Sequence, residues 1–447
     1  MTKKLLRSQA ARVKTGFWSL SPNKISKLFF YLLLLFLPTQ LGKHFWPDWS
    51  FVYGLRLDYL SPTLYLTDVF IILILTFSLP KFYSWVSNTH KKYLFGFTLV
   101  LVSFLLGLAG AKNYWAGIYG IGKFLAFSFL AYFVARNYKV FNKTILFICV
   151  FSAVVFEALL AFLQYFNQGS IGGMFYLFGE RAFNAETPGI ANASINGQLF
   201  LRPYATFSHP NVLAGFLVLA MLFLFMFSYK NQHLKIFALF GSFLGTAALL
   251  LTLSRTVILL WLVYLIILFG LWVVEKYKKG KFNSQQLTLS ILIFAAIVIF
   301  IILQNNFILQ RFLTTKLSDE SLVQRQELIT QSLNMFWQSP VFGVGINNFF
   351  NNLNAISVRE NISLIQPVHN IFLLVLSETG IIGLIAFLFI LAKSFLSILK
   401  KQNKYLLLCL LAIIFLGMFD HYFLTLQQGQ LLFALVLGAS FSRTINE

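Results

Sequence analysis

Cysteine and acidic residues are rare in this chain. Of its 447 residues only two are cysteines, Cys149 and Cys409, and only 14 are Asp or Glu. Both cysteines fall within predicted apolar spans, which excludes a disulfide framework and a thiolate zinc site as organising features. The linear sequence also holds no Asp-x-Asp motif and no His and carboxylate cluster with the spacing of a metal site. We therefore expect neither a metal ion nor a cofactor.

Charged residues of either sign are few as well. They make up 11% of the chain, against about 25% in soluble domains. Apolar residues make up 58%, and Phe alone occurs 53 times. Windows of about 20 apolar residues predict twelve membrane spans, near 25–42, 62–80, 93–110, 114–135, 143–166, 208–228, 235–253, 256–274, 287–304, 370–392, 404–424 and 427–442. We predict an all-α polytopic membrane protein: one integral membrane domain over residues 1–447, with an outer loop subdomain at 305–370 within it.

The basic residues indicate how the chain is oriented. With the amino terminus in the cytoplasm, inner segments carry 24 of the 35 Lys and Arg, outer segments carry ten, and Lys123 lies within the fourth span. This asymmetry satisfies the positive-inside rule. The net charge of +21 is therefore mainly a topology signal and an attraction to membrane lipids. No separate basic domain suggests a nucleic-acid partner.

Lysine and arginine are distributed differently across the predicted membrane. The inner segments hold twenty Lys and four Arg, whereas the outer segments hold three Lys and seven Arg. The outer arginines are Arg56, Arg181, Arg202, Arg255, Arg311, Arg325 and Arg359. A planar guanidinium with bidentate donors is well suited to gripping a phosphate. The alternative is that Arg is simply better tolerated than Lys in partly buried outer loops.

One polar segment, Arg202–Asn211, opens the predicted span at 208–228. An ionisable group at membrane depth is costly unless it meets a partner, so Arg202 is a candidate for a functional site that holds an anion. His209 stands between Ser208 and Pro210, which fits a residue that caps the start of a helix. We favour this structural role for His209 over a catalytic one.

A second polar segment precedes the predicted span at 370–392. The pattern over 322–337 predicts an amphipathic helix that lies on the outer membrane face, and Ser339-Pro340 ends it. The segment closes with His369-Asn370. A histidine here can take a proton while the neighbouring amide fixes its orientation. Taken alone, His369 is better interpreted as a helix-start residue with a satisfied ring nitrogen, and the arginines predicted on the same side of the membrane favour the functional interpretation. Glu378 lies nine residues further on, on the opposite helix face, and is expected to bond another helix.

Three other polar positions have alternative interpretations. Asp420-His421 places an acid beside a possible base, and we rank it below His369 as a catalytic element. Asp68 and Glu157 both lie within predicted spans and need polar partners. Either one is expected to pair with Lys123.

Four sequence blocks in this order resemble the O-antigen ligase and polymerase superfamily. The blocks are Arg202–Ala214, Leu253–Thr256, Arg325 with Ser339–Phe349, and His369-Asn370 with Glu378–Gly383. Members of that superfamily are integral membrane glycosyltransferases with a GT-C-type fold. They move a glycan from undecaprenyl diphosphate to an acceptor sugar hydroxyl, on a glycan or glycolipid, at the outer side of the cytoplasmic membrane.

The resemblance implies a role for each matching residue. His369 is the implied general base, Arg202 and Arg255 are the implied diphosphate ligands, and Arg325 is a third contact or positions the acceptor. His209, Asn211, Asn370 and Glu378 are supporting residues. The resemblance further implies a metal-independent, inverting transferase in the cytoplasmic (inner) membrane, whose active site faces the periplasm or the cell exterior.

Other functions stay open at this point. An O-antigen or polysaccharide polymerase shares the donor chemistry of a ligase and differs only in its acceptor. A lipid-linked oligosaccharide transporter or flippase would suit twelve spans, but such proteins often consist of repeated halves, and none is evident here. A non-catalytic scaffold for envelope assembly would have no need of His369.

Overall fold

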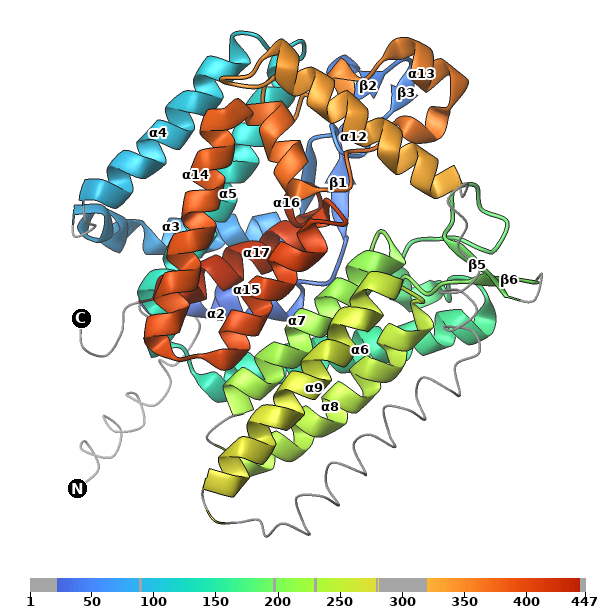
Figure 1. Cartoon of the computed structure of the whole chain (residues 1–447). Helices are drawn as coiled ribbons and strands as arrows, with labels where there is room; N and C mark the ends of the chain where they lie inside the picture. Colours follow the sequence, from blue (N-terminus) through green and yellow to red (C-terminus); the bar gives the residue numbers. More distant parts are fainter. Residues whose placement is uncertain are drawn as a thin grey trace, which may run out of the picture.

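The computed structural model describes residues 22–87, 91–195, 198–228, 231–278, 280 and 320–442. The predicted span at 287–304, Arg311, and residues 305–319 of the predicted outer subdomain lie outside these ranges. Within them the chain is mostly helical (Figure 1).

Seven helices of the described residues are long and apolar enough to cross a membrane. They are α3 (Leu66–Ser87), α5 (Tyr114–Asn137), α6 (Lys143–Asn167), α7 (Pro210–Ser228), α8 (Gln232–Leu251), α9 (Arg255–Lys278) and α14 (Ile371–Lys401). Shorter helices lie among them: α2 (Pro22–Leu35), α4 (Lys91–Leu108), α15 (Lys404–Gly417), α16 (Tyr422–Thr425) and α17 (Gln427–Ser440). The chain is thus a polytopic membrane protein. Eleven of the twelve predicted spans fall on helices of the described residues. Seven of these helices are long and apolar enough to cross a membrane, and the other four spans fall on the shorter helices.

Helix α7 forms the centre of the helical core. Its side chains from Val212 to Leu224 are buried, and it packs against α6, α8, α15 and α17. A helix that is apolar on every face is stable only when protein or lipid surrounds it, and here protein does. Figure 1 shows α6, α7 and α8 side by side, with α4, α5 and α14 in a separate part of the molecule, and α9 contacts α7. Cys149 on α6 and Cys409 on α15 are buried and free.

The prediction of an all-α chain needs a correction in two loops. Three two-stranded antiparallel pairs are present: β1 (Gly42–His44) with β4 (Thr63–Tyr65), β2 (Phe51–Val52) with β3 (Leu55–Arg56), and β5 (Asn192–Ile195) with β6 (Gln198–Leu201). The first four strands lie between α2 and α3, and the last two lie between α6 and α7. These strands have two to four residues each, too short to show a clear period-2 pattern in the sequence.

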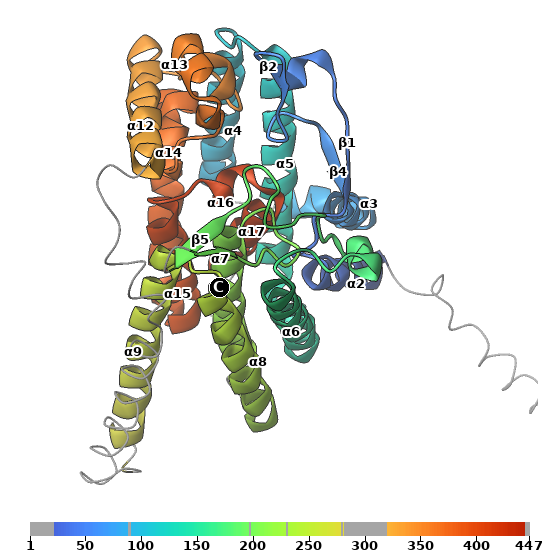
Figure 2. The same cartoon turned by 90° about the vertical axis from the view of Figure 1, so that its right-hand side faces the viewer.

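Helix α12 (Glu320–Gln338) confirms the predicted helix at 322–337 and packs against α14. In Figure 2, α12 and α13 (Ala355–Glu360) lie at the opposite end of the molecule from the lower ends of α8 and α9. Leu328 and Met335 on α12 are buried, and Ser332 Oγ donates a hydrogen bond to Leu373 O at 3.1 Å. The helix is therefore fixed to the first turn of α14.

A break in α14 receives the segment that follows α12. Gly380 has φ 64° and ψ −166°, which interrupts the helix. The freed backbone groups pair with the incoming segment: Val344 N donates to Ser377 O at 3.0 Å, and Ile381 N donates to Pro340 O at 2.9 Å. A Cβ atom at Gly380 would collide with the Val341 carbonyl group. Glycine is required there both for the backbone angles and for the close approach.

Candidate active site

A single large cavity, of about 3630 Å³, contains every arginine and histidine that the sequence analysis assigned to the diphosphate and the base. Arg202, Arg255, Arg325 and His369 all line it. They come from four places: the loop before α7, the first residue of α9, helix α12, and the loop before α14. The fold thus brings together residues that are far apart in the sequence.

Arg202 is held rigidly at the side of this cavity. Its Nε donates to Thr252 O at 2.6 Å, and one terminal nitrogen donates to Asn211 Oδ1 at 2.7 Å. Only 7% of the residue is exposed. A guanidinium fixed in this way keeps a defined orientation at the cavity wall.

The backbone that carries Arg202 is bound by polar side chains of α6. Glu157 accepts hydrogen bonds from Thr206 N at 3.1 Å and Thr206 Oγ1 at 2.8 Å. Gln164 accepts from Tyr204 N at 3.0 Å and Ala205 N at 2.6 Å. These bonds keep Ala205 at φ 48°, a conformation that a non-glycine residue rarely adopts.

Asp68 and Glu157, which were both predicted as possible partners of Lys123, have different partners in the structure. Asp68 forms the ion pair, with 2.7 Å between Lys123 Nζ and Asp68 Oδ2. Gln427 of α17 completes this network, because its Oε1 accepts from Lys123 Nζ at 3.0 Å and its Nε2 donates to Asp68 Oδ1 at 2.8 Å. Glu157 is instead used by the Arg202 loop.

Arg255 is the first residue of α9 and lies beside the anchor of Arg202. The turn between α8 and α9 contains Thr252, whose carbonyl binds Arg202, and Leu253, whose φ is 50°. Because Arg255 lies three residues after Thr252, the same turn positions both arginines at the cavity wall.

Asn211 and His209 complete this side of the cavity. His209 Nδ1 accepts a hydrogen bond from Asn211 N at 3.1 Å, as expected of a residue that caps α7. Asn211 Nδ2 donates to Asp420 Oδ2 at 3.3 Å. Asn211 therefore joins the guanidinium of Arg202 to a carboxylate on the other side of the cavity.

His369 lies beside a second histidine. The ring centroids of His369 and His421 are 5.2 Å apart in an edge-to-face arrangement. Among the described residues, no hydrogen-bond partner reaches the buried Nδ1 of His369. Burial lowers the pKa of the His369 imidazole, Asp420 acts to raise it, and Arg325 acts to lower it. The net direction is downward, which favours the neutral ring.

The expectation that the Asn370 amide orients the His369 ring was wrong. Asn370 Oδ1 accepts from Phe372 N at 2.9 Å and Leu373 N at 3.0 Å, so it caps α14. Asn370 Nδ2 donates to Met418 O at 3.2 Å. Because Met418 lies just before Asp420-His421, Asn370 instead fixes that loop against the start of α14 and places His421 beside His369.

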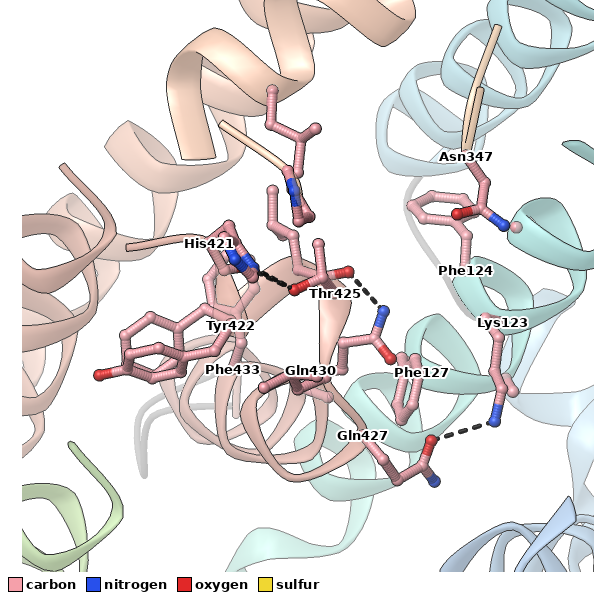
Figure 3. Close-up of a pocket in the computed structure, with 18 of the residues that line it drawn as sticks. Lys123, Phe124, Phe127, Asn347, His421, Tyr422, Thr425, Gln427, Gln430 and Phe433 are labelled. Atoms are coloured by element: carbon pink, nitrogen blue, oxygen red, sulfur yellow. Dashed lines mark hydrogen bonds between the residues drawn. The ribbon is translucent and has the colours of Figure 1, made fainter. Parts of the chain in front are cut away.

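The Asp420-His421 pair is the part of the site to which the sequence analysis gave too little weight. Asp420 Oδ1 accepts from His421 N at 2.8 Å, and its Oδ2 accepts from Asn211. His421 Nδ1 lies 2.7 Å from Thr425 Oγ1, a contact drawn in Figure 3. Helix α12 reaches the same loop, since a terminal nitrogen of Arg325 lies 3.5 Å from Phe419 O. The only sequence signal was that Asp420 and His421 are adjacent at the predicted outer end of a span.

Glu378 bonds a loop and not another helix, which corrects the prediction for it. Its Oε1 accepts from Phe349 N at 3.1 Å, and the backbone amides of Asn347 and Asn348 also interact with it. The carboxylate thus fixes the loop that crosses the break in α14. Asn347, on this loop, faces the branch of the cavity that contains Phe124 and Lys123 of α5 (Figure 3).

Fold and site together define a class: a polytopic membrane protein with a large charged cavity, whose lining includes Arg202, Arg255, Arg325, His369 and His421. Residues 240–388, about a third of the chain, match the family model described as O-antigen ligase. Over these residues the chain therefore carries an O-antigen ligase domain. This domain indicates a ligase- or polymerase-type membrane enzyme of polysaccharide assembly. The match includes Arg255, Arg325, His369 and Glu378. No curated protein matches the chain.

Proposed function

We propose that this protein is an outer-face glycosyltransferase that moves a glycan from undecaprenyl diphosphate to a sugar hydroxyl of an acceptor. One observation carries the proposal: Arg202, Arg255, Arg325 and His369, from four separate segments, line one cavity. A transferase needs a phosphate grip and a base within reach of the same reacting carbon. A transporter has no use for a base there, and a scaffold needs neither group.

Arg202 and Arg255 bind the donor diphosphate in this proposal. The leaving group gains negative charge as the glycosidic bond breaks, so fixed guanidinium donors stabilise the transition state more than the ground state. The bonds from Arg202 to Thr252 O and Asn211 Oδ1 supply the rigidity. Arg325 enters from α12 and is a third contact or positions the acceptor.

His369 acts as the general base. A sugar hydroxyl is a poor nucleophile until its proton is removed as it attacks. The partly buried, neutral imidazole can accept that proton through a ring nitrogen. Asp420 and His421 position the ring from one side, and the Asn370 cap fixes their loop against α14.

The reaction proceeds by direct displacement and inverts the anomeric carbon. A retaining route would need a free carboxylate as nucleophile. The carboxylate of Asp420, which has an oxygen within 4.8 Å of a ring nitrogen of His369, accepts hydrogen bonds on both oxygens, from His421 N and Asn211 Nδ2. We assign Asp420 the role of holding the site together through these two bonds, and not that of attacking the sugar. We propose the transfer to be independent of metal ions.

The proposed substrates are membrane-bound at least on the donor side. The donor enters from the lipid, and the glycan product leaves on the periplasmic or extracellular side of the cytoplasmic membrane. A ligase uses a surface glycolipid as acceptor, and a polymerase uses a second lipid-linked repeat. Both fit the same donor site.

The test is a transfer assay with the purified protein in detergent. The protein is incubated with an undecaprenyl diphosphate glycan and with each acceptor type, and the product linkage is determined by NMR. We expect a new glycosidic bond of inverted configuration and release of undecaprenyl diphosphate. A product that retains the donor configuration, or movement of the intact lipid-linked glycan between vesicle leaflets with no new bond, would overturn the proposal.

A further inference from the structure

Three potential metal ligands meet beside the proposed base. One ligand atom each of His369, Asp420 and His421 lies within 4.8 Å of the other two. We propose that these three side chains bind one divalent transition-metal ion such as Zn²⁺, and that the bound ion removes His369 from the transfer reaction. The inhibition of transfer by the ion rests on the proposed function, whereas the metal-binding site does not.

The donor set selects the type of ion. Two imidazoles and one carboxylate are typical of zinc sites with three protein ligands and one open position. Mg²⁺ and Ca²⁺ prefer oxygen ligands only, and this site offers few. Ligands of a tetrahedral Zn²⁺ lie roughly 3.3 Å apart, given metal–ligand distances of about 2.0–2.1 Å. Side-chain rotations of His369 and His421 can close the remaining gap.

The surroundings of the three ligands fit a metal site. The contact between His421 Nδ1 and Thr425 Oγ1 leaves Nε2 of that ring for a metal. Asp420 is oriented by hydrogen bonds from His421 N and Asn211 Nδ2. Bonds of this kind to the outer atoms of ligands are usual in metal sites and fix the ligand direction. His369 supplies the third ligand, and its buried Nδ1 has no hydrogen-bond partner among the described residues.

The charges of Asp420 and Arg325 should influence how tightly the site binds a divalent ion. Asp420 offsets one of the two positive charges of the ion. Arg325 acts electrostatically on His369 and therefore opposes a cation at this position. Removing the Arg325 charge should strengthen metal binding, although Arg325 is not itself a ligand.

The bound ion and the transfer reaction compete for the same residue. Metal coordination uses the lone pair with which His369 would accept the proton of the acceptor hydroxyl. Zn²⁺ should therefore inhibit transfer, and a chelator should restore it. Chelator alone should leave transfer unchanged, since the reaction itself is proposed to need no metal.

The binding test uses Co²⁺ as a visible probe on the full-length, chelator-treated protein. We expect one Co²⁺ per chain, with absorption bands that Zn²⁺ abolishes and Mg²⁺ does not. Asp420→Asn and His421→Gln should each weaken binding by at least ~10-fold, and Arg325→Gln should strengthen it. His233→Gln changes an exposed histidine of α8 outside the cavity and should have no effect.

Binding and transfer are read separately, so the two proposals can fail independently. No Co²⁺ spectrum, or equal binding by the wild type and all the ligand variants, would overturn the metal site. Loss of transfer with chelator alone would overturn the inhibitory role. Metal binding that depends on Asp420 and His421 in a protein without transfer activity would support the site while the proposed function fails.

Discussion

At the scale of single residues, His369 is the sharpest test of the transfer mechanism. Replacing it with Ala removes the only proposed proton acceptor, so turnover should fall by about 10²–10⁴-fold. His369 lies in a loop and donates no capping bond, so the thermal unfolding midpoint in detergent should change little. Rates are measured with donor and acceptor at saturation. The matched control is His233→Ala, which should keep wild-type turnover.

Arg202 and Arg255 allow a test in which the positive charge of the side chain stays constant. In Arg202→Lys the positive charge remains, but one ammonium group cannot reach both Thr252 O and Asn211 Oδ1 while it also binds a diphosphate. A hydrogen bond to a charged group contributes about 1.5–3 kcal/mol, so kcat/KM for the donor should fall by roughly 10–100-fold. Arg255→Lys should show a similar loss. Arg56→Lys, on β3 and outside the cavity, is the control. Full activity of both cavity variants would mean that the phosphate contacts lie elsewhere.

Some residues of this site could be predicted from their local sequence, and others could not. Arg202 and His369 were candidates from the sequence because each precedes a long apolar run. A polar side chain at the end of a membrane span is costly unless it has a partner or a function. Asp420 and His421 were undervalued because their importance comes from contact with His369, and no local pattern encodes that contact. The cluster of potential metal ligands formed by His369, Asp420 and His421 was missed for the same reason: its members meet only in the folded chain. The role of Asn370 was misjudged because an amide next to a histidine is just as able to cap the following helix.

At the scale of elements, hydropathy predicted helices well and their ends less well. The predicted span at 208–228 became α7 at Pro210–Ser228, since a run this apolar has few alternatives in a membrane. The predicted span at 404–424 is divided into α15 and the short α16, and the turn between them carries the site. The break at Gly380 was invisible, because its freed backbone groups are satisfied by residues 340–344, far away in the sequence.

The break in α14 leads to a prediction about stability. Gly380→Ala would put a side chain at φ 64° and into the Val341 carbonyl group. The backbone strain alone costs about 1–3 kcal/mol, and the collision adds to it. The unfolding midpoint in detergent should therefore fall clearly. Gly270→Ala on α9 places a methyl group where nothing lies within 4 Å and should change stability little. Equal midpoints for both variants would show that the inserted loop contributes nothing to the fold.

At the scale of the whole molecule, the site joins two parts of the chain. Arg202 and Arg255 belong to the side built on α7 and α9, whereas Arg325, His369 and His421 belong to the side built on α12, α14 and α16. The hydrogen bond from Asn211 Nδ2 to Asp420 Oδ2, at 3.3 Å, connects the two sides. Through it the proposed diphosphate ligands and the proposed base keep a fixed relative position, which the proposed glycan transfer requires.

This connection predicts that substitutions on the two sides are not additive. Asn211→Ala removes the link to Asp420 and one anchor of Arg202 at once, so it should lower kcat more than it raises the KM of either substrate. Combined with Asp420→Asn, it should cost little beyond the larger single effect, because both changes break the same bond. Residues that share no partner usually act additively within about 0.3–0.5 kcal/mol. Asn211→Ala with Gly270→Ala is the additive control. A double-mutant cycle on kcat/KM measures the coupling, and a coupling near zero for Asn211 and Asp420 would mean that the two sides of the cavity work without this bond.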